Sequence, residues 1–296
     1  MRSALSKLEV VRPRRLTEAL SEMAEAASRE RPTPIAGGTD LFVYLNAGEL
    51  GATRYLDLLG LRELRGIQVR RDAVVLGALT TFHEIRTHPA IVRRLPSLAA
   101  AAAEVGALQI QHRATIAGNV ANASPAGDSL PVLLAHDAVV HVRSVRGERA
   151  IPFERLYTGY RTLATDPDEL ITAISIPTPP SGAFAFFRKV GTRRAQSISK
   201  VVFAGLLASD KRHRSVLVRF AYGSVAPTPV RARNAEQALI GEPPSAAAAA
   251  RAQQALARDI APIDDIRSER DYRMTVAGNV LDQFLRAADP RFMRGS

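Results

Sequence analysis

The sequence predicts an α+β protein, and three features of the chain lead to that fold class. Its 296 residues are 46% hydrophobic and 23% charged, a balance typical of a globular chain with room for substantial cores. Strand-like and helical segments both precede a stretch rich in proline and glycine at 177–182. Beyond that stretch, strand-like segments come first and helical segments follow, as in an α+β domain. We therefore expect a domain boundary here, with domains at 1–177 and 178–290.

The first domain is expected to mix short helices with short strands. Apolar residues three and four positions apart predict an amphipathic helix near the start of the chain. Prolines at 89 and 96 are expected to break a long helical stretch into pieces. The expected elements are a helix at 16–30, a strand at 54–59, two strands within 67–78, helices over 81–105, a helix at 129–136 and a strand at 138–144.

The second domain is expected to hold a three-stranded sheet followed by helices. Its strand-like segments are rich in β-branched and aromatic residues, and its later segments contain alanine-rich helix formers. The expected strands are 183–190, 200–209 and 215–225, and the expected helices are 229–240, 245–259 and 269–287.

Composition excludes several kinds of chemistry. The chain has no cysteine, so it cannot form disulfides, ligate an iron–sulfur cluster or use a thiol nucleophile. Neither a signal peptide nor a membrane span is indicated, so a cytoplasmic location is expected. The net charge of +11 comes from scattered arginines, and aromatic residues are only 5%. That pattern favours an anionic small molecule or an acidic protein partner over nucleic acid.

The familiar catalytic motifs are missing. The sequence has no dinucleotide-binding G-x-G-x-x-G after a strand, no phosphate-binding G-x-x-x-x-G-K-[ST], no G-x-S-x-G and no H-E-x-x-H. Its six histidines do not have the spacing of metal ligands. We therefore expect neither a catalytic residue nor a metal site of this chain's own.

Two glycine-bearing loops remain, AGGTD at 36–40 and TIAGN at 115–119. The first sets Gly37 beside Gly38, which taken alone favours a tight turn because glycine tolerates positive φ. The alternative is a loop whose backbone N–H groups approach a phosphate. The second loop continues through asparagine, serine and aspartate to residue 128, which together could surround a phosphorylated ligand rich in hydroxyl groups.

The order and spacing of several motifs resemble one family over nearly the whole chain. The motifs are AGGTDL, LGALTTFHEI, TIAGNVANASPAGDSLP, GYRTL, APTPVRA and SERDYRMTVAGNVL. Together they are similar to the FAD-binding medium subunit of the molybdenum hydroxylases, the group that includes xanthine, carbon monoxide and aldehyde dehydrogenases. The long third motif is the most specific of them.

The resemblance implies a fold of the vanillyl-alcohol-oxidase or PCMH type. Two subdomains, about 1–57 and 58–177, would hold FAD without a covalent bond, and a CO-dehydrogenase-flavoprotein-like domain would follow at 178–290. This fold binds the diphosphate on loops of its own, so the missing dinucleotide fingerprint is expected. The implied cofactor-binding residues are Pro34, Ile35, Ala36, Gly37, Gly38, Thr39, Asp40, Leu41, Val105, Thr115, Ala117, Gly118, Asn119, Ser124, Asp128, Ile171 and Lys189.

Specific roles for these residues also follow from the resemblance. The glycine pair would let the backbone reach the diphosphate, Thr39 would add a hydroxyl donor, and Thr115, Gly118 and Asn119 would contact the same region. Asp128 would accept hydrogen bonds from ribityl or adenosine hydroxyls. An aliphatic side chain over the isoalloxazine is implied at Ile171, where ordinary strand packing is an equal alternative. A cation at the ring edge is implied at Lys189, and the alternative is a solvated surface lysine.

The chain departs from the family pattern in two places. Ala117 stands where relatives commonly have glycine, which makes a backbone contact at that position doubtful. The run Ile110–Arg113 replaces an Ile-Arg-Asn-Arg run in many relatives and could alter the charge near the phosphates, although Arg113 is retained.

The resemblance implies an electron-transfer role. FAD would receive electrons from the 2Fe–2S clusters of a small subunit, after a large molybdopterin subunit has oxidised the substrate, in a heterotrimer or a dimer of heterotrimers. The acceptor would be NAD, oxygen or a quinone. A stand-alone flavin reductase or oxidase of the same fold is an alternative, and a basic interaction protein without a cofactor is a third.

Overall fold

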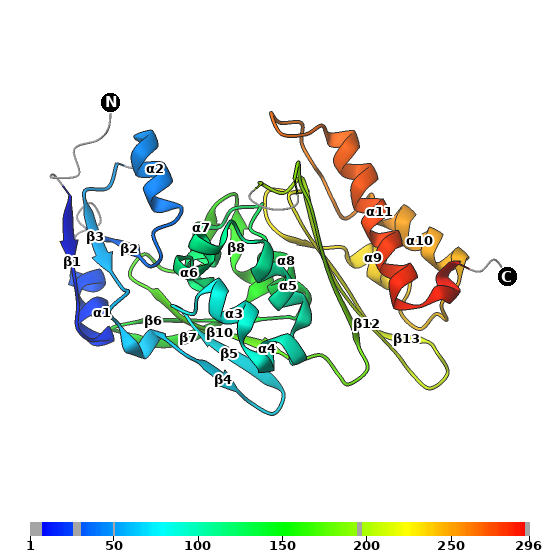
Figure 1. Cartoon of the computed structure of the whole chain (residues 1–296), viewed down its shortest axis with the longest axis horizontal. Coiled ribbons are helices and arrows are strands. Elements are labelled where there is room, and N and C mark those ends of the chain that lie inside the picture. Colours follow the sequence, from blue (N-terminus) through cyan, green and yellow to red (C-terminus); the bar gives the residue numbers. More distant parts are fainter. Residues whose placement is uncertain (1–7, 26–30, 50, 194–196, 294–296) are drawn as a thin grey trace.

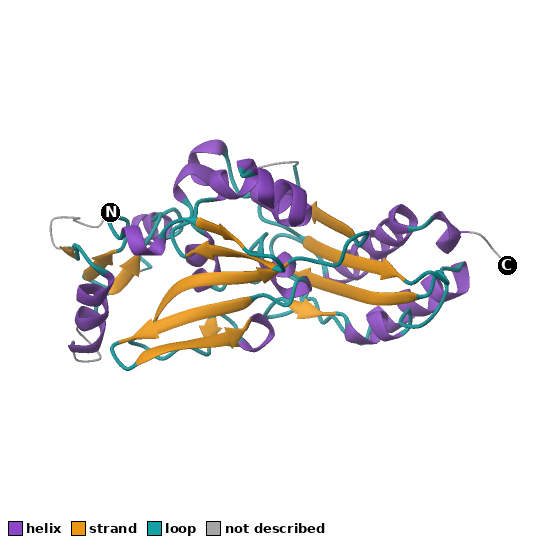
Figure 2. Cartoon of the chain, turned by 90° about the horizontal axis from the view of Figure 1, so that it is seen from below, coloured by secondary structure: helices purple, strands orange, loops and turns teal. Residues whose placement is uncertain are grey.

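In the computed structural model, three larger β-sheets follow one another along an elongated molecule, and a two-stranded sheet accompanies them (Figures 1 and 2). The structure describes residues 8–25, 31–49, 51–193 and 197–293. The N-terminal end lies at one extremity and the C-terminal end at the other. Among the described helices, none has the length and apolar character needed to cross a membrane.

The first sheet is small and parallel. Strands β1 (Glu9–Val11), β3 (Arg54–Asp57) and β2 (Thr33–Ile35) lie side by side in that order. Helix α1 (Leu16–Glu25) buries Leu16, Ala19, Leu20 and Met23 in the core beneath this sheet. The helix was expected to reach residue 30, and 26–30 lie outside the described residues. After β2, the first glycine loop leads directly into α2 (Leu41–Ala47).

The second sheet is antiparallel, and helices cover one of its faces. Its order is β4 (Ile67–Val69), β5 (Ala73–Gly77), β10 (Leu170–Pro177), β6 (Val139–Ser144) and β7 (Gly147–Pro152). Six short helices cover one face: α3 (Phe82–Thr87), α4 (Pro89–Arg94), α5 (Pro96–Glu104), α6 (Leu108–Arg113), α7 (Ile116–Asn122) and α8 (Leu130–Ala135). The breaks expected at the two prolines are confirmed, because α4 and α5 each begin with proline.

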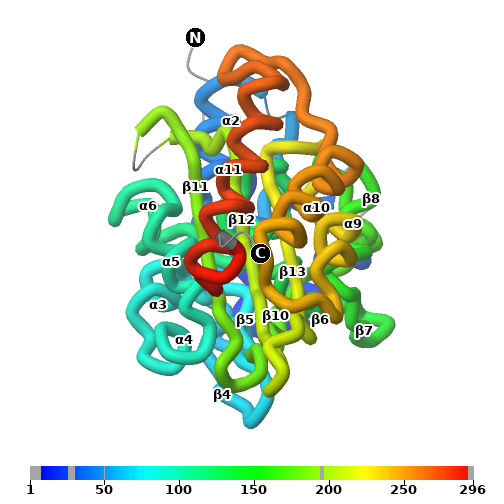
Figure 3. The backbone as a smooth tube through the Cα atoms, turned by 90° about the vertical axis from the view of Figure 1, so that its right-hand side faces the viewer, coloured from blue at the N-terminus to red at the C-terminus, as the bar shows by residue number. Residues whose placement is uncertain are grey.

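The third sheet lies on the far side of these helices. Its order is β11 (Phe184–Val190), β12 (Val201–Ser209), β13 (Ser215–Gly223) and β14 (Val230–Arg231). Helices α5 and α8 pack on one face, and α11 (Arg270–Ala288) packs on the other with α10 (Ala246–Leu256) and α9 (Arg233–Gln237) (Figure 3). Because both faces are covered, β12 is buried along nearly its whole length.

The C-terminal sheet therefore has four strands where the sequence predicted three. The missed strand, β14, is only two residues long and pairs with Ala221 and Tyr222. The three longer strands and the three helices lie where the sequence predicted them, within a few residues at each end. The core between sheet and helices is aromatic, with Phe203, Phe220 and Phe284 in mutual contact at centroid distances of 5.4–6.0 Å.

Smaller elements complete the chain. A two-stranded hairpin, β8 (Tyr157–Gly159) and β9 (Thr162–Leu163), rises beside the pocket described below. Within the described residues, single turns of 3₁₀ helix make short connections at Arg62–Leu64, Phe153–Arg155 and Pro290–Met293.

Candidate functional site

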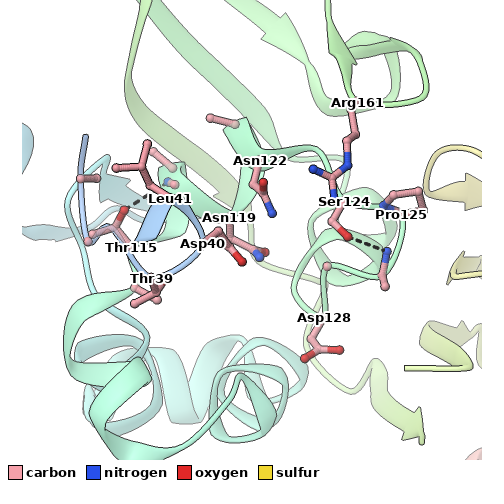
Figure 4. A pocket seen from close by; sticks show the side chains of 18 of the residues that line it. Thr39, Asp40, Leu41, Thr115, Asn119, Asn122, Ser124, Pro125, Asp128 and Arg161 are labelled. Carbon is pink, nitrogen blue, oxygen red and sulfur yellow. Dashed lines mark hydrogen bonds between the residues drawn. The ribbon is translucent and has the colours of Figure 1, made fainter. Parts of the chain in front are cut away.

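A cavity of about 1550 Å³ opens between the three larger sheets, each with its helices, which we call the N-terminal, middle and C-terminal units (Figure 4). Its wall includes the β2–α2 loop, helix α7 with the segment that follows it, strand β10, strand β11 and loops of the C-terminal region. Every cofactor-binding residue expected from the sequence lies on this wall, from Pro34 to Lys189. The fold thus brings together segments more than 100 residues apart in the chain.

The two glycines of the first loop are required for different reasons. A β-carbon on Gly37 would lie 1.9 Å from the backbone oxygen of Arg113, at the end of α6, so this glycine allows two loops to touch. Gly38 has a φ of +75°, a left-handed conformation that strains other residues. The loop joins a strand to a helix, so it is not the simple strand reversal that the glycine pair alone suggested.

The backbone of this loop presents free donors. From Gly37 to Leu41, five successive N–H groups donate to no acceptor within the described parts of the chain. Four of these five residues are buried or half-buried, and N–H groups in such positions normally have partners, so the run is well placed to bind a ligand on the pocket wall. Successive N–H groups of this kind form a concave nest for an anion such as a phosphate.

The second loop is built differently, because four of its five backbone donors, those of residues 116–119, are already used. The N–H of Ile116 donates to Thr80 (2.9 Å), that of Ala117 to Ala78 (3.2 Å) and that of Asn119 to the carbonyl of Thr115 (3.0 Å). The N–H of Gly118 donates to the Thr115 hydroxyl at 3.1 Å, which caps α7.

What the second loop offers to a ligand is therefore its side chains. The Thr115 hydroxyl accepts a bond from the backbone and keeps its own hydrogen for donation. The Asn119 carbonyl oxygen accepts from the Ser129 hydroxyl at 2.7 Å, which leaves the amide NH₂ free within the described structure. Figure 4 shows both side chains on the pocket wall near Thr39 and Asp40.

The two departures from the family pattern are explained by packing. Ala117 is 8% exposed and its methyl group belongs to the core beneath the first sheet, while its N–H bonds to Ala78. The side chain of Arg113 is exposed and does not line the cavity. The retained arginine therefore contributes its backbone carbonyl, which contacts Gly37, rather than a charge at the site.

Asp128 and Lys189 form a buried ion pair. The Lys189 ammonium donates to Asp128 Oδ2 at 2.6 Å and to the carbonyl of Glu104 at 3.1 Å. The two side chains are only 10% and 4% exposed, so Lys189 is not the solvated surface lysine that was the alternative. Burial raises the pKa of Asp128 to about 6, although the charge of Lys189 acts to lower it. Asp128 Oδ1 is buried without a partner among the described residues, so it remains free to accept from a ligand.

Two aliphatic residues give the wall an apolar portion. Val105, just after α5, and Ile171, on β10, are partly buried and pack against the core of the middle unit. The pairing of β10 with β6 shifts register between Ile171 and Ala173. Such a bulge changes the direction in which neighbouring side chains point. Both residues could face a flat aromatic ligand, as well as packing in the ordinary way.

Several residues of the wall were not given a role from the sequence. Tyr44 of α2 and Arg161 of the β8–β9 hairpin line the cavity. Asn122 of α7 also lines it, as expected for the continuation of the second loop. Ser224 and Arg273 line it from the C-terminal region, where Arg273 donates to the Ser224 carbonyl at 2.7 Å. Three of the motifs that carried the resemblance, GYRTL, APTPVRA and SERDYRM, lie in or beside these wall segments and were the available signal.

The donor set fits FAD. The nest and the side chains of Thr115 and Asn119 suit a diphosphate, the free oxygen of Asp128 suits a hydroxyl, and the aliphatic portion suits a ring system. Among the described residues, no group of three or more His, Cys, Asp or Glu side chains could hold a metal ion. Fold and site together define a protein that binds an extended, phosphorylated ligand between three structural units.

Comparison with known proteins identifies the class more closely. The family model described as "FAD binding domain in molybdopterin dehydrogenase" matches residues 6–179, and the one described as "CO dehydrogenase flavoprotein C-terminal domain" matches 186–288. The chain belongs to the FAD-binding medium subunits of the molybdenum hydroxylase family, which are subunits of oxidoreductases.

Similar proteins include two bacterial subunits. The putative xanthine dehydrogenase FAD-binding subunit of Escherichia coli K12 is 31% identical over 262 residues, which cover 86% of this chain and 89% of that protein. The nicotinate dehydrogenase FAD-subunit of Eubacterium barkeri is 32% identical over 72% of this chain and 73% of its own. The solved carbon monoxide dehydrogenase of Hydrogenophaga pseudoflava matches with a TM-score of 0.91 and 26% identity, over 96% of this chain and 98% of that one.

Proposed function

We propose that this chain is an electron-transfer subunit whose FAD receives electrons from 2Fe–2S clusters of a small partner subunit and delivers them to an external acceptor. Substrate oxidation would take place on a large molybdopterin subunit of the same complex, a heterotrimer or a dimer of heterotrimers. The observation that carries the proposal is the run of five free N–H groups on the wall of a large pocket. The names of the relatives, which are FAD-binding subunits of dehydrogenases, support it.

We place the parts of the molecule as follows. Two subdomains, about 1–57 and 58–177, would grip the cofactor, and the C-terminal domain at 178–290 would close the pocket from the other side. The residues that line the pocket from all three parts support this division. FAD supplies the redox chemistry, since it accepts two electrons and can release them one at a time or together.

The chain's own residues bind and tune the cofactor. The nest from Gly37 to Leu41 would hold the diphosphate, with the hydroxyls of Thr39 and Thr115 and the amide of Asn119 as further donors. The free oxygen of Asp128 would accept from a hydroxyl of the cofactor. Lys189 would lie near the ring edge and favour the negative charge that reduced flavin carries. Its pairing with Asp128 reduces that effect, because the pair is neutral when both groups are ionised.

A two-stage experiment tests this function. The purified or FAD-reconstituted chain should show flavin absorption bands, and a folded chain that binds no FAD would contradict the proposal. The chain should then co-purify with an iron–sulfur subunit and a molybdopterin subunit from its source. The isolated flavoprotein should show little turnover of organic substrates. Turnover at ordinary enzymatic rates, roughly 1–1000 s⁻¹, would replace this function by that of a stand-alone flavoenzyme.

A further inference from the structure

We propose that Arg161 binds the diphosphate of FAD, an inference that rests on the proposed function and adds a residue to that site. Arg161 stands at the tip of the β8–β9 hairpin and lines the cavity. Figure 4 shows its side chain extending from the hairpin toward Asn122 and Ser124. Its φ is +53°, an uncommon conformation for a residue with a β-carbon, which persists only where the surroundings maintain it.

Arg161 connects the hairpin to the segment that follows the nest. Its Nη1 donates to the hydroxyl of Tyr44, 117 residues away, at 2.7 Å. The guanidinium carbon lies 5.3 Å from the centre of the Tyr44 ring and 5.8 Å from that of Tyr160. Contacts of this kind favour a cation over an aromatic face and limit its freedom to move. Tyr44 is on α2, which begins at the last residue of the nest, so the contact brings Arg161 to the nest's side of the pocket.

Arg161 forms no direct ion pair with a carboxylate of the described residues. Lys189 is paired with Asp128, and Arg273 donates to Asp265 at 2.7 Å. Arg161 instead donates to a neutral hydroxyl, and no carboxylate of the described residues lies within ion-pair distance of it. A guanidinium can donate two parallel bonds to a phosphate, which makes arginine well suited to a diphosphate.

The nest itself needs such a charge. Asp40 lies within it, burial raises the pKa of this carboxyl, and the charge of Arg161 acts to lower it. An ionised Asp40 would repel a bound diphosphate because both are negatively charged. The N–H groups of the nest are neutral, so they offer donors but no full positive charge to offset this repulsion. Arg161 supplies the missing charge for both anions, while Tyr44 and Tyr160 hold it in place.

Titration of apoprotein with FAD and with riboflavin, followed by flavin fluorescence, tests this assignment. Arg161→Gln should weaken FAD binding by about 10- to 100-fold, the usual effect of losing a charged hydrogen bond. Riboflavin has no phosphate, so its affinity should not change. Arg143→Gln is the matched control, because Arg143 is exposed on β6 and does not line the cavity. The salt dependence of FAD binding should also become weaker in Arg161→Gln and stay unchanged in the control.

The outcomes separate this inference from the proposed function. If the wild-type chain does not bind FAD, the proposed function fails. If it does bind FAD and Arg161→Gln binds equally well, only the role of Arg161 is overturned. An equal loss for FAD and riboflavin also overturns it, since Arg161 would then support the ring or the pocket shape. Thermal melting checks that the variant folds. If Arg161→Gln does not fold, Arg161→Lys replaces it in the test. We then expect the affinity for FAD to fall by about 3- to 10-fold and the affinity for riboflavin to stay the same, because an ammonium cannot donate two parallel bonds.

Discussion

The two glycine-bearing loops of the pocket present their donors in opposite ways. The loop at 36–40 leaves a run of backbone N–H groups without partners in the described structure, while the loop at 115–119 uses four of its five backbone donors to fix itself to the neighbouring turn and to cap α7. The first can therefore bind an anion through the main chain, and the second mainly through side chains. Similar sequences of small and polar residues thus contribute through different atoms, and substitutions in them should have different consequences.

The largest effect is expected for Gly37→Ala. The new β-carbon would lie 1.9 Å from the Arg113 carbonyl, so the first loop would have to move away from α6 and the nest would lose its shape. We expect FAD affinity to fall by about 100-fold or more, and the melting temperature to fall as well. Gly60→Ala is the control, because its β-carbon would meet nothing within 4 Å. Near-normal FAD binding by Gly37→Ala would show that the two loops need not touch.

The Asp128 carboxyl beyond the second loop should respond to pH, whereas the main-chain N–H donors of the first loop should not. Burial raises the pKa of Asp128 from 3.8 to about 6. As pH falls, the folded state therefore binds this proton at a higher pH than the unfolded state does. Protonation of Asp128 thus adds to the free energy of unfolding, fully below pH 3.8, and this contribution is lost as pH rises through about 6.

The comparison of wild type with Asp128→Asn measures this contribution. The asparagine variant cannot titrate, so the free energy of unfolding of wild type relative to it should fall by up to about 3 kcal/mol between pH 4 and pH 7. Urea unfolding of the apoprotein at several pH values gives this difference. A difference that does not change with pH would mean that Asp128 is not buried beside Lys189 as the structure places it.

A smaller effect is expected for Gly38→Ala. The φ of +75° strains an alanine by about 1–2 kcal/mol, and its β-carbon would lie 3.0 Å from the Phe42 ring. Phe42 is half exposed and can move aside, so the main cost is backbone strain. FAD affinity should fall by roughly 5- to 30-fold. Gly38→Val should bind more weakly still, because a branched side chain is larger and stiffer. Normal FAD binding by both variants would mean that the loop only changes the direction of the chain and does not bind the diphosphate.

The sequence was informative where local rules dominate. The helix breaks at Pro89 and Pro96 follow from proline geometry and were predicted. The binding residues expected from the resemblance all line one pocket. The sequence could not predict that backbone N–H groups of the second loop are already hydrogen-bonded. Their acceptors include the carbonyls of Ala78 and Thr80, which the fold brings from another segment.

Long-range contacts and very short strands were also beyond the sequence. Asp128 and Lys189 are 61 residues apart, and each was assigned a role toward the cofactor without any sign that they pair with each other. Strand β14 has two residues, too few for an alternating pattern to be visible. Arg161 was part of a recognised motif, but its position on the pocket wall depends on a hairpin whose strands have three and two residues.

The second loop offers the next test, Thr115→Val. This change removes the cap of α7 and the hydroxyl that we expect to donate to the diphosphate. Loss of such a cap costs about 1 kcal/mol of stability. Where the variant is still folded, its FAD affinity should be a few-fold lower than that of wild type, because a donor to the diphosphate is lost. Thr81→Val is the control, since Thr81 also caps a helix, α3, through its side-chain oxygen, with Glu84 completing a capping box, and does not line the pocket. Equal effects of the two variants on FAD affinity would assign Thr115 a purely structural role.

The smallest effect is expected for Gly118→Ala, and it separates the two loops most clearly. Gly118 has no positive φ, and its β-carbon would meet only the Thr115 hydroxyl at 3.0 Å and the Ala36 methyl group at 4.0 Å. A shift of a few tenths of an ångström relieves the contact, and alanine gains up to about 1 kcal/mol over glycine in a helix. Its N–H is already used by the cap, so no ligand donor is lost. FAD affinity and melting temperature should therefore stay close to wild type. A large loss of affinity with unchanged stability would show that the cofactor approaches this backbone directly, and the contrast between the two loops would then fail.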